Sequence, residues 1–418
     1  MNSLQDRERT HGCRFCGTPL SVTFADLGAT PLANSYLQPE ELESTEAFYP
    51  LHVRVCSECF LVQLPSCVSP ETLFNHYAYF SSYSESWLRH AEDYATKMIA
   101  REGLSPSSKV IEVASNDGYL LQYFQRQGIS VLGIEPAQNV AEVAQKLGIP
   151  TLTIFLGKES ACQLTERGMG ADLLIANNVL AHVPDLNDFV GGLRRLLKPE
   201  GLLTVEFPHL LQLMRQNQFD TIYHEHFSYL SLMTVQRIFA AHGLQVCDVD
   251  ELPTHGGSLR VYAQREGSEP RPVHERVAAV LSREQEMGLD CEETYTEFND
   301  RVGSVKRNLL AFLSEARQQG KSVVGYGAPA KGNTLLNYCG IRSDFLAFTV
   351  DRSPHKQGRY LPGSHIPIRH PDAIFEAKPD FVLILPWNLR EEIVEQMAGI
   401  RDWGGQFVVP IPAVEVLL

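Results

Sequence analysis

The sequence predicts an α/β fold in three parts: a small cysteine-bearing N-terminal module, a central doubly wound Rossmann-like domain, and a smaller C-terminal α/β domain. Three observations support this prediction. Two C-x-x-C pairs stand within the first sixty residues. Apolar strand-like runs then alternate with helical runs, which is the pattern of a parallel sheet covered by helices. The same alternation starts again near residue 320, after a long charged segment.

These patterns place the N-terminal module at residues 1–72, the central domain at 73–268, and the C-terminal domain with its helical linker at 269–418. A chain of 418 residues is too long for one ordinary core, which agrees with several domains. Strands of the central domain are expected at KVIEVAS, VLGIEP, ADLLIANN and LLTVEFP.

The composition excludes several classes of protein. The formal net charge of -14 argues against a nucleic-acid-binding protein, because such proteins usually carry a basic excess. No run approaches the roughly 20 apolar residues of a membrane helix. The polar N-terminus lacks the apolar core of a signal peptide, so we expect a cytoplasmic protein. We also expect a monomer, because each ligand site can be built within one chain.

The two cysteine pairs predict a structural zinc site. A C-x-x-C turn lets two thiolates face one ion, and two such turns supply four thiolates. Four protein ligands leave no position for water, so the metal would be structural. The alternatives are unrelated thiols or a redox-active pair, which would need one pair rather than two. The expected ligands are Cys13, Cys16, Cys56 and Cys59.

A cofactor loop is expected in KVIEVASNDGYLL, residues 109–121. An apolar strand leads into a turn with Asp117 and Gly118, where backbone amides can approach a ligand at a helix N-terminus. The next strand ends at Glu135, whose carboxylate can accept the hydroxyls of an adenosine ribose. A dehydrogenase would need G-x-G-x-x-G, and the first two glycines are missing. A methyltransferase tolerates one glycine and favours an acidic residue such as Glu112 at the end of the first strand.

The polar pair that ends the strand ADLLIANN adds a further signal, because open α/β sheets bind ligands at the carboxyl edge of their strands. Together these segments predict a cofactor site for S-adenosyl-L-methionine, the alternative being a structural turn that binds no ligand. Its expected residues are Glu112, Ala114, Asn116, Asp117, Gly118, Glu135, Pro136, Asn177 and Asn178.

The segment DTIYHEHFSYLS, residues 220–231, gathers titratable groups between apolar stretches. In an extended conformation Tyr223 and Glu225 would point one way, and His224 and His226 the other. Such a cluster suits proton transfer, with histidine and glutamate as base and partner and tyrosine as donor. One alternative is a second metal site, although consecutive ligands rarely converge. Another is an ordinary surface stretch.

A second glycine loop stands in VVGYGAPAKGNTLLNY. Its glycines, Lys331 and Thr334 suit a phosphate held at a helix N-terminus. Asp351 closes the next strand, where a carboxylate would bind a ribose, and His355 follows in a local basic group. The loop suits either NAD or a nucleotide diphosphate, or it is a purely structural turn. The expected substrate-binding residues of this domain are Gly327, Lys331, Gly332, Thr334, Asp351 and His355.

The motifs in combination resemble the sugar C-methyltransferases that act on nucleotide-linked 4-keto deoxysugars, in particular the C-3'-methyltransferases of antibiotic pathways. The matching segments run in the family's order over nearly the whole chain. They are the two C-x-x-C pairs, YAYFSSYSESW, EVASNDGYLL, ANNVLAHV, YHEHFSYLS and GYGAPAKGNTLLNY.

The resemblance implies a zinc module, a central S-adenosylmethionine domain, and a C-terminal domain that helps hold the nucleotide. It implies that His226 removes the proton next to the ketone and that Glu225 sits beside the sugar. Tyr77, His182 and Tyr223 would line the pocket. Tyr79 competes with Tyr77, because the tyrosine run leaves the register ambiguous, and it is kept as a substrate-binding candidate. That run could also simply pack a linker helix.

Carbon methylation beside a ketone requires a base for the α-proton and donors for the developing oxyanion. A histidine that titrates near neutral pH suits the first task. The expected partner is a TDP-linked 4-keto deoxysugar methylated at C-3', with C-5' as an alternative. Two other hypotheses are a methyltransferase of another carbonyl acceptor and a zinc-containing NAD-dependent oxidoreductase. A non-enzymatic zinc scaffold is the least favoured.

Overall fold

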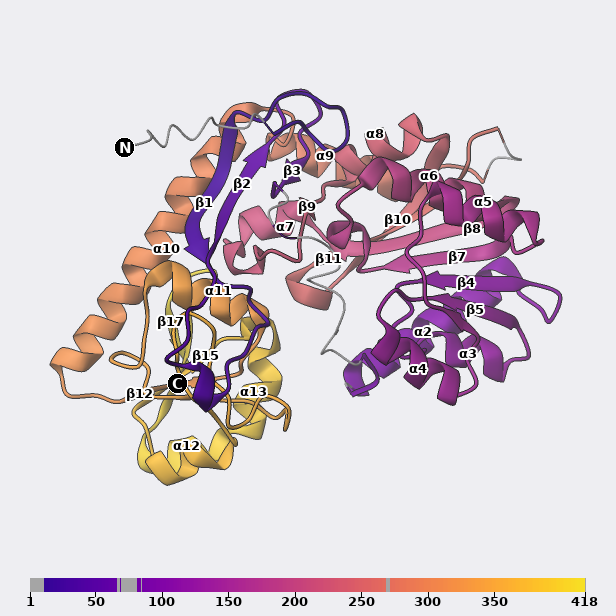
Figure 1. Cartoon of the computed structure of the whole chain (residues 1–418). Coiled ribbons are helices and arrows are strands. Elements are labelled where there is room, and N and C mark those ends of the chain that lie inside the picture. Colours follow the sequence, from indigo (N-terminus) through magenta and orange to yellow (C-terminus); the bar gives the residue numbers. More distant parts are fainter. Residues whose placement is uncertain (1–10, 66–67, 69–80, 84, 268–270, 418) are drawn as a thin grey trace, which may run out of the picture.

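The computed structural model describes residues 11–65, 68, 81–83, 85–267 and 271–417. The described chain forms two lobes (Figure 1). One lobe carries the central sheet and its helices. The other combines the N-terminal strands, the long helix α10 and the C-terminal domain. The boundaries expected at 72/73 and 268/269 lie outside the described residues and stay predictions.

The N-terminal part forms a four-stranded antiparallel sheet in the order β1-β2-β3-β9. Its strands are β1 (Val22–Thr30), β2 (Tyr49–Val55), β3 (Val62–Gln63) and β9 (Ser228–Tyr229), and the short helix η1 (Pro39–Glu41) follows β1. Strands β1 and β2 are 9 and 7 residues long. The last strand comes from the central part of the chain, and Tyr229 pairs with Val62. The module therefore shares a sheet with the residues that follow Tyr223–His226, which we call the YHEH segment.

The central domain contains a seven-stranded sheet in the order β10-β11-β8-β7-β4-β5-β6. Five neighbouring strands are parallel, as expected, whereas β11 runs antiparallel to β8 and β10. The strands are β4 (Lys109–Val113), β5 (Ser130–Ile134), β6 (Thr151–Leu152), β7 (Ala171–Asn177), β8 (Leu197–Pro208), β10 (Leu244–Leu252) and β11 (Ser258–Arg265).

Helices cover this sheet and connect its strands. The α-helices are α2 (Glu85–Glu102), α3 (Leu121–Arg126), α4 (Gln138–Lys146), α5 (Lys158–Glu166), α6 (Leu186–Leu196), α7 (Leu210–Arg215) and α8 (Leu232–Ala241). The 3-10 helices are η2 (Ser81–Tyr83), η3 (Leu180–His182), η4 (Phe219–Thr221) and η5 (Thr254–Gly256). In α6, Leu186, Val190 and Leu193 recur at helical spacing and are fully buried, which explains how this helix packs on the sheet.

The charged linker is helical, as expected, with α9 (Glu275–Glu286) and the long α10 (Glu292–Gln318). Helix α10 lies along β1 (Figure 1). The ring of Phe298 stacks on Phe24 with centroids 4.6 Å apart. The linker thus joins the N-terminal sheet to the C-terminal domain through a common apolar core.

The C-terminal domain restarts the α/β pattern in a six-stranded sheet of order β14-β13-β12-β15-β16-β17. All its pairs are parallel except β16 with β17. The strands are β12 (Val323–Tyr326), β13 (Thr349–Val350), β14 (Ile368–Arg369), β15 (Phe381–Ile384), β16 (Gln406–Val409) and β17 (Glu415–Leu417). The helices are α11 (Ala330–Cys339), α12 (Asp372–Ala377), η6 (Trp387–Leu389), α13 (Arg390–Gln396) and η7 (Ala398–Trp403).

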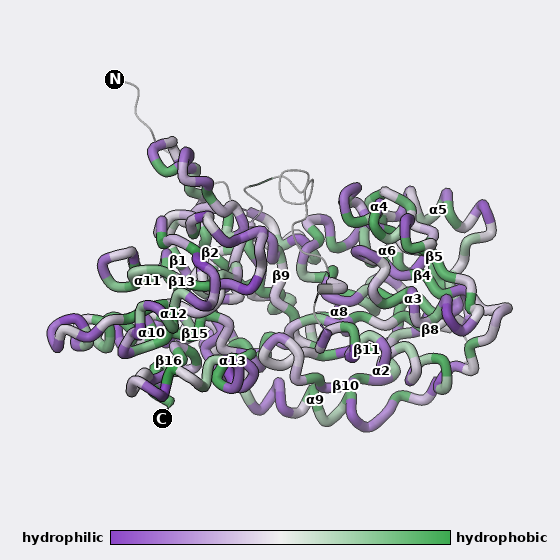
Figure 2. The backbone as a smooth tube through the Cα atoms, turned by 90° about the horizontal axis from the view of Figure 1, so that it is seen from below, coloured by the Kyte–Doolittle hydropathy of each residue, from purple (hydrophilic) through white to green (hydrophobic). Residues whose placement is uncertain are grey.

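Apolar residues follow the strands, and polar residues gather on outer loops and helices (Figure 2). Strands β7 and β15, each in the parallel part of its sheet, are almost continuously apolar, because helices cover both faces of a parallel sheet. This arrangement leaves the loops at the strand ends to form sites.

Candidate active site and zinc centre

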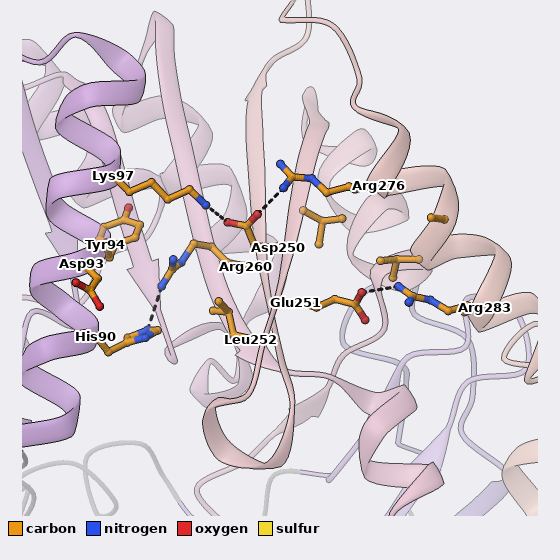
Figure 3. A pocket seen from close by; sticks show the side chains of 13 residues that line it. His90, Asp93, Tyr94, Lys97, Asp250, Glu251, Leu252, Arg260, Arg276 and Arg283 are labelled. Carbon is orange, nitrogen blue, oxygen red and sulfur yellow. Dashed lines mark hydrogen bonds and ion pairs between the residues drawn. The ribbon is translucent and has the colours of Figure 1, made fainter.

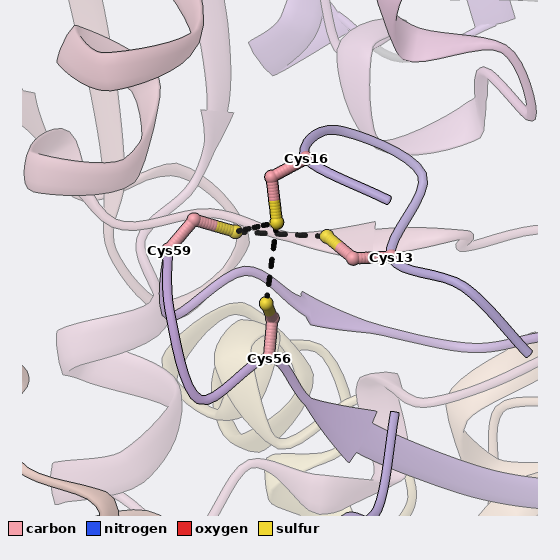
Figure 4. Close-up of side chains that lie close together, drawn as sticks. All are labelled: Cys13, Cys16, Cys56 and Cys59. Carbon is pink, nitrogen blue, oxygen red and sulfur yellow. Dashed lines mark hydrogen bonds between the residues drawn. The ribbon is translucent and has the colours of Figure 1, made fainter. Parts of the chain in front are cut away.

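The four cysteines of the two C-x-x-C pairs lie together (Figure 4), with all Sγ atoms within 4.8 Å of one another. The Sγ atoms of Cys13 and Cys59 are 3.6 Å apart, and those of Cys16 and Cys56 are 3.5 Å apart. A tetrahedral zinc ion with Zn–S bonds of about 2.3 Å would separate its thiolates by about 3.8 Å. The geometry therefore fits the zinc ion that the sequence predicts.

Each pair sits on a tight turn closed by a backbone hydrogen bond. The N–H of Gly17 donates to the carbonyl of Cys13 at 2.9 Å, and the N–H of Phe60 to that of Cys56 at 3.0 Å. Four thiolates complete the coordination shell, so this site is structural. Among the described residues, no other histidine, cysteine and carboxylate cluster has metal-ligand spacing, which does not support a metal at His224, Glu225 and His226.

The expected cofactor loop follows β4 and bends sharply. Ala114, Asn116 and Gly118 have positive φ angles of 56°, 49° and 80°. A left-handed alanine is uncommon and costs conformational energy, so the fold must hold it in place. Gly118 is required sterically as well, because a Cβ there would lie 2.9 Å from Cγ1 of Ile149.

Glu135, at the end of β5, holds this loop. Its carboxylate accepts hydrogen bonds from the N–H of Asn116 and the N–H of Ala137, each at 2.9 Å. Burial raises the pKa of Glu135, and these two donors oppose the shift. The predicted ribose ligand therefore also shapes the loop, and Pro136 beside it is half-buried.

Several buried acceptors at the carboxyl edge of β4 and β7 have no hydrogen-bond partner within the described chain: Glu112 Oε2, Asp117 Oδ1, Asn177 Oδ1 and Asn178 Oδ1. Burial, with the charges of Glu135 and Asp117, raises the pKa of Glu112 well above its usual value. Unpaired buried acceptors are costly unless a ligand satisfies them. The edge therefore fits a ligand such as S-adenosylmethionine, which carries ammonium, sulfonium and hydroxyl groups.

The end of the tyrosine-rich run covers this loop. The N–H of Ser81 donates to Oδ1 of Asn116 at 3.0 Å, and the N–H of Ser82 to Oδ2 of Asp117 at 3.2 Å. Trp87, in α2, stacks near Tyr119 with ring centroids 6.2 Å apart. Tyr77 and Tyr79 lie outside the described residues, so their roles stay predictions.

The YHEH segment is not extended, and the predicted alternation of its side chains is wrong. The N–H of His226 donates to the carbonyl of Tyr223 at 2.9 Å, which closes a turn. The rings of Tyr223 and His226 therefore lie on one side and contact each other, with centroids 4.0 Å apart and planes tilted by 34°. Local hydrogen bonding in the turn replaced the strand pairing that an alternating pattern would need.

His226 and His182 lie next to each other, with ring centroids 4.7 Å apart. Nδ1 of His226 donates to the carbonyl of Thr221 at 2.7 Å, and Nδ1 of His182 to that of Glu225 at 2.8 Å. A carbonyl can only accept, so each neutral ring carries its lone pair on Nε2. Burial lowers the pKa of His182 to about 4 and, with the charge of His182, lowers the pKa of His226 well below 6.5. Both rings are neutral near pH 7.

The side chain of Glu225 binds the N-terminal module. Asn34 Nδ2 donates to its Oε1 at 2.7 Å, and burial raises the pKa of Glu225 to about 7. His224 also binds the module, because its Nε2 donates to the carbonyl of Pro50 at 3.2 Å. Glu225 and His224 thus bind the module, whereas His226 packs against His182 and Tyr223.

The second glycine loop contacts the same turn. Thr334 is buried, and its hydroxyl donates to the carbonyl of Ile222 at 2.9 Å. Nζ of Lys331 donates to Asn388 at 2.6 Å and lies 4.5 Å from the ring centre of Trp387. Gly327 has a φ of 90°, and a Cβ on Gly332 would lie 3.1 Å from Leu385.

Asp351 closes this loop with hydrogen bonds from the N–H of Ala328 and of Ser353, each at 2.8 Å. His355 is exposed. The predicted phosphate and ribose roles of this loop therefore stay predictions, and Thr334 has a protein partner of its own.

Sequence reasoning missed four residues, which are Trp387, Asp220, Glu206 and His255. Nε1 of Trp387 donates to Asp220 at 2.7 Å, and burial raises the pKa of Asp220 to about 6. Glu206, at the end of β8, is buried, and although burial opposes it, hydrogen bonds from His90 and Arg260 lower its pKa to about 2. His255 follows on η5. The strand-breaking glycines of THGGS were the available signal for His255.

A pocket of about 530 Å³ lies elsewhere, between α2, β10 and α9 (Figure 3). Its charged groups pair with one another: Asp250 with Lys97 at 2.5 Å and with Arg276 at 3.0 Å, and Glu251 with Arg283 at 2.6 Å. None of the predicted site residues lines it. The charges are used internally, so this pocket is not the candidate active site.

Three family models match successive parts of the chain: “Putative zinc binding domain” at residues 13–74, “Methyltransferase domain” at 87–249 and “C-methyltransferase C-terminal domain” at 253–412. The C-methyltransferase NovU of Streptomyces niveus is 38% identical over 405 residues, which is 97% of this chain and 96% of that protein. A ubiquinone biosynthesis O-methyltransferase of Bartonella bacilliformis is 29% identical over 98 residues, 23% of this chain and 40% of that protein.

Among solved structures, the PH0226 protein of Pyrococcus horikoshii OT3 aligns with a TM-score of 0.38 at 15% identity, covering 47% of this chain and 98% of that one. The described helices include none long and apolar enough to cross a membrane. The oxidoreductase alternative is not supported, because the matches are to methyltransferases over nearly the whole chain. With its four-cysteine zinc centre, its cofactor-loop geometry and this full-length relationship, the chain belongs to the family of S-adenosylmethionine-dependent C-methyltransferases.

Proposed function

We propose that this enzyme methylates the carbon next to the 4-keto group of a TDP-linked deoxysugar, in an antibiotic pathway. C-3' is the favoured carbon and C-5' the alternative. The observation that carries the proposal is the neutral His226, whose Nδ1 is held by the Thr221 carbonyl while its Nε2 keeps the lone pair. An enolate requires such a base beside the acidic C–H bond. The sequence motifs of the sugar C-methyltransferases supply the substrate class.

In this proposal, His226 takes the α-proton on Nε2, and the electron pair of the broken C–H bond moves onto the ketone oxygen. His182 and Tyr223 lie within ring contact of His226 and line the sugar site. Glu225, with its raised pKa, lies beside the sugar and is oriented by Asn34. Tyr77 and Tyr79 would complete the pocket. When bound, S-adenosylmethionine supplies an electrophilic methyl group.

We propose the following roles for the three domains and for the residues predicted to bind ligands. Residues 1–72 would form the zinc module, 73–268 the cofactor domain, and 269–418 the domain that holds the nucleotide through Gly327, Lys331, Gly332, Thr334, Asp351 and His355. The cofactor would contact Glu112, Ala114, Asn116, Asp117, Gly118, Glu135, Pro136, Asn177 and Asn178. Each chain would work as a monomer in the cytoplasm.

Two experiments test the substrate. Mass spectrometry of 4-keto TDP-sugars, incubated with enzyme and cofactor, should show a gain of one methyl group on carbon. Thymidine diphosphate should raise the melting temperature, because a ligand that binds the folded state stabilises it. Absence of both effects would exclude a TDP-sugar substrate.

The base is tested by His226→Asn. We expect the methyl-transfer rate to fall about 100-fold or more, the usual contribution of a general base. S-adenosylhomocysteine and thymidine diphosphate should still bind, since the ring does not form the cofactor loop. Full turnover in this variant would show that His226 is not the base.

A further inference from the structure

His255 stands in a backbone conformation that histidine rarely adopts. Its φ and ψ are 56° and 21°, inside the short helix η5. The next two residues, Gly256 and Gly257, also have positive φ angles, of 88° and 117°. A strained residue persists only where its surroundings determine it, and such residues concentrate at functional sites.

The surroundings of this turn come from both lobes. A Cβ on Gly256 would lie 2.6 Å from Trp387, and the carbonyl of Gly256 accepts a hydrogen bond from Gln218 at 2.8 Å. The hydroxyl of Thr254 donates to Glu206 at 3.2 Å. The turn is thus fixed on both sides, although His255 itself remains exposed. The fold holds the backbone of this turn and leaves the imidazole accessible.

Trp387 connects this turn to the proposed base. The same indole that packs on Gly256 donates to Asp220, which directly precedes Thr221. The carbonyl of Thr221 holds Nδ1 of His226. On its other side His255 lies against Trp87, with ring centroids 5.3 Å apart, and Trp87 belongs to the helix that covers the cofactor loop. His255 therefore lies between the cofactor side and the base side of the site.

The local charges favour an anion here. The protein groups around His255 lower its pKa below the usual value, although the residue keeps accessible surface, and the nearby Lys331 lowers it further. The charges of His255 and Lys331 in turn help to lower the pKa of His226. A neutral imidazole still carries one N–H donor. The N–H of His255 can therefore stabilise negative charge that develops on a substrate, because its neighbours disfavour additional positive charge.

We propose that His255 is a further catalytic residue, whose N–H donates to the ketone oxygen of the substrate as the α-proton leaves. The C–H bond next to the ketone breaks, and its proton goes to Nε2 of His226. The electron pair forms the carbon–carbon double bond and shifts the carbonyl pair onto oxygen, where His255 meets it. This inference rests on the proposed function, because it requires a keto substrate.

The test is deuterium uptake at the α-carbon of the 4-keto TDP-sugar in D2O, with S-adenosylhomocysteine bound so that no methyl transfer occurs. His255→Gly keeps the left-handed backbone and removes the donor, whereas His255→Asn keeps the backbone and a donor, since both residues tolerate this conformation. We expect the glycine variant to exchange about 100-fold more slowly, the usual effect of losing one oxyanion donor. The asparagine variant should recover much of the rate, with KM little changed in both.

His365→Gly is the matched control. His365 also has a φ of 56°. Its ring, however, binds Glu46 at 3.1 Å, which is not one of the residues around the proposed base. This variant should exchange at the wild-type rate. Melting temperature and zinc content verify that each variant is folded.

Wild-type exchange in His255→Gly would overturn the role of His255 and leave the proposed function standing. An asparagine variant as slow as the glycine variant would also overturn it, because a donor would then not matter. If the wild-type enzyme exchanges no 4-keto sugar nucleotide, the proposed function fails and this inference fails with it.

Discussion

Both α/β domains close their first loop in the same way. In the cofactor domain, Glu135 accepts from the backbone N–H of Asn116 and of Ala137. In the C-terminal domain, Asp351 accepts from the N–H of Ala328 and of Ser353. In each case a carboxylate at the end of the second strand fixes the loop after the first strand. The two loops nevertheless use their other polar groups differently.

The loop after β4 leaves buried acceptors such as Glu112 Oε2 and Asp117 Oδ1 without a partner in the described part of the protein, which is costly unless a ligand binds. The segment after β12 has one such acceptor, Asn333 Oδ1, and its donors bind other parts of the chain. Thr334 binds the carbonyl of Ile222, and Asn333 binds that of Ala33 at 2.6 Å. The first loop is therefore built for a ligand, while the second also holds the YHEH turn in place.

Zinc removal should have the largest effect on activity, and it should affect the YHEH segment but not the cofactor loop. The metal module pairs with β9, which directly follows the YHEH segment, and metal binding supplies folding energy to such modules. We expect a chelator to abolish methyl transfer while the affinity for S-adenosylhomocysteine changes little. Calorimetric titration with and without chelator measures this. Equal loss of both properties would mean that the cofactor loop depends on the module too.

A matched glycine pair tests the comparison directly. Gly118→Ala and Gly327→Ala each place a Cβ on a left-handed residue, 2.9 Å from Ile149 in one loop and 2.5 Å from Pro386 in the other. The conformational cost is about 1–2 kcal/mol. We expect Gly118→Ala to weaken S-adenosylhomocysteine binding about tenfold. Gly327→Ala should leave that affinity unchanged and weaken thymidine diphosphate instead, and the reverse pattern would contradict the assignment.

Thr334→Val tests the link between the C-terminal loop and the YHEH turn. The substitution keeps the shape but leaves the buried Ile222 carbonyl without its donor, which costs about 1–3 kcal/mol. Denaturant unfolding measures that loss. We expect kcat to fall severalfold with unchanged affinity for S-adenosylhomocysteine. An unchanged kcat would show that the turn keeps its geometry without this contact.

The smallest effect concerns pH. His226 has a pKa well below 6.5, so it should remain an active base as the pH falls through 6.5. Glu225 has a pKa of about 7, so an inflection of kcat/KM near pH 7 would belong to this carboxyl. Glu225→Gln should remove that inflection and leave the acid limb of His226 at lower pH. An acid limb that stays at pH 7 in Glu225→Gln would assign it to the base instead.

The sign of the stability effect follows from the same pKa values. His182 has a folded pKa of about 4, against 6.5 in the unfolded chain. Below pH 6.5 the unfolded chain therefore binds more protons, and this histidine makes the protein less stable as the pH falls from 6.5 toward 4. Replacing His182 by asparagine should flatten the decline of the melting temperature in this window.

The sequence by itself determined the zinc ligands and the parallel α/β core of the central domain, and it predicted where the cofactor loop lies. Cysteine spacing, apolar periodicity and the placement of glycine and carboxylate are local patterns, so they can be recognised without knowledge of the fold. The turn at Tyr223 and His226 was not predictable, because its alternating polar pattern also suits a strand. Tertiary structure alone brought His255, Trp387 and Asp220 together from three distant segments. Their roles depend on contacts between lobes, which no sequence spacing encodes.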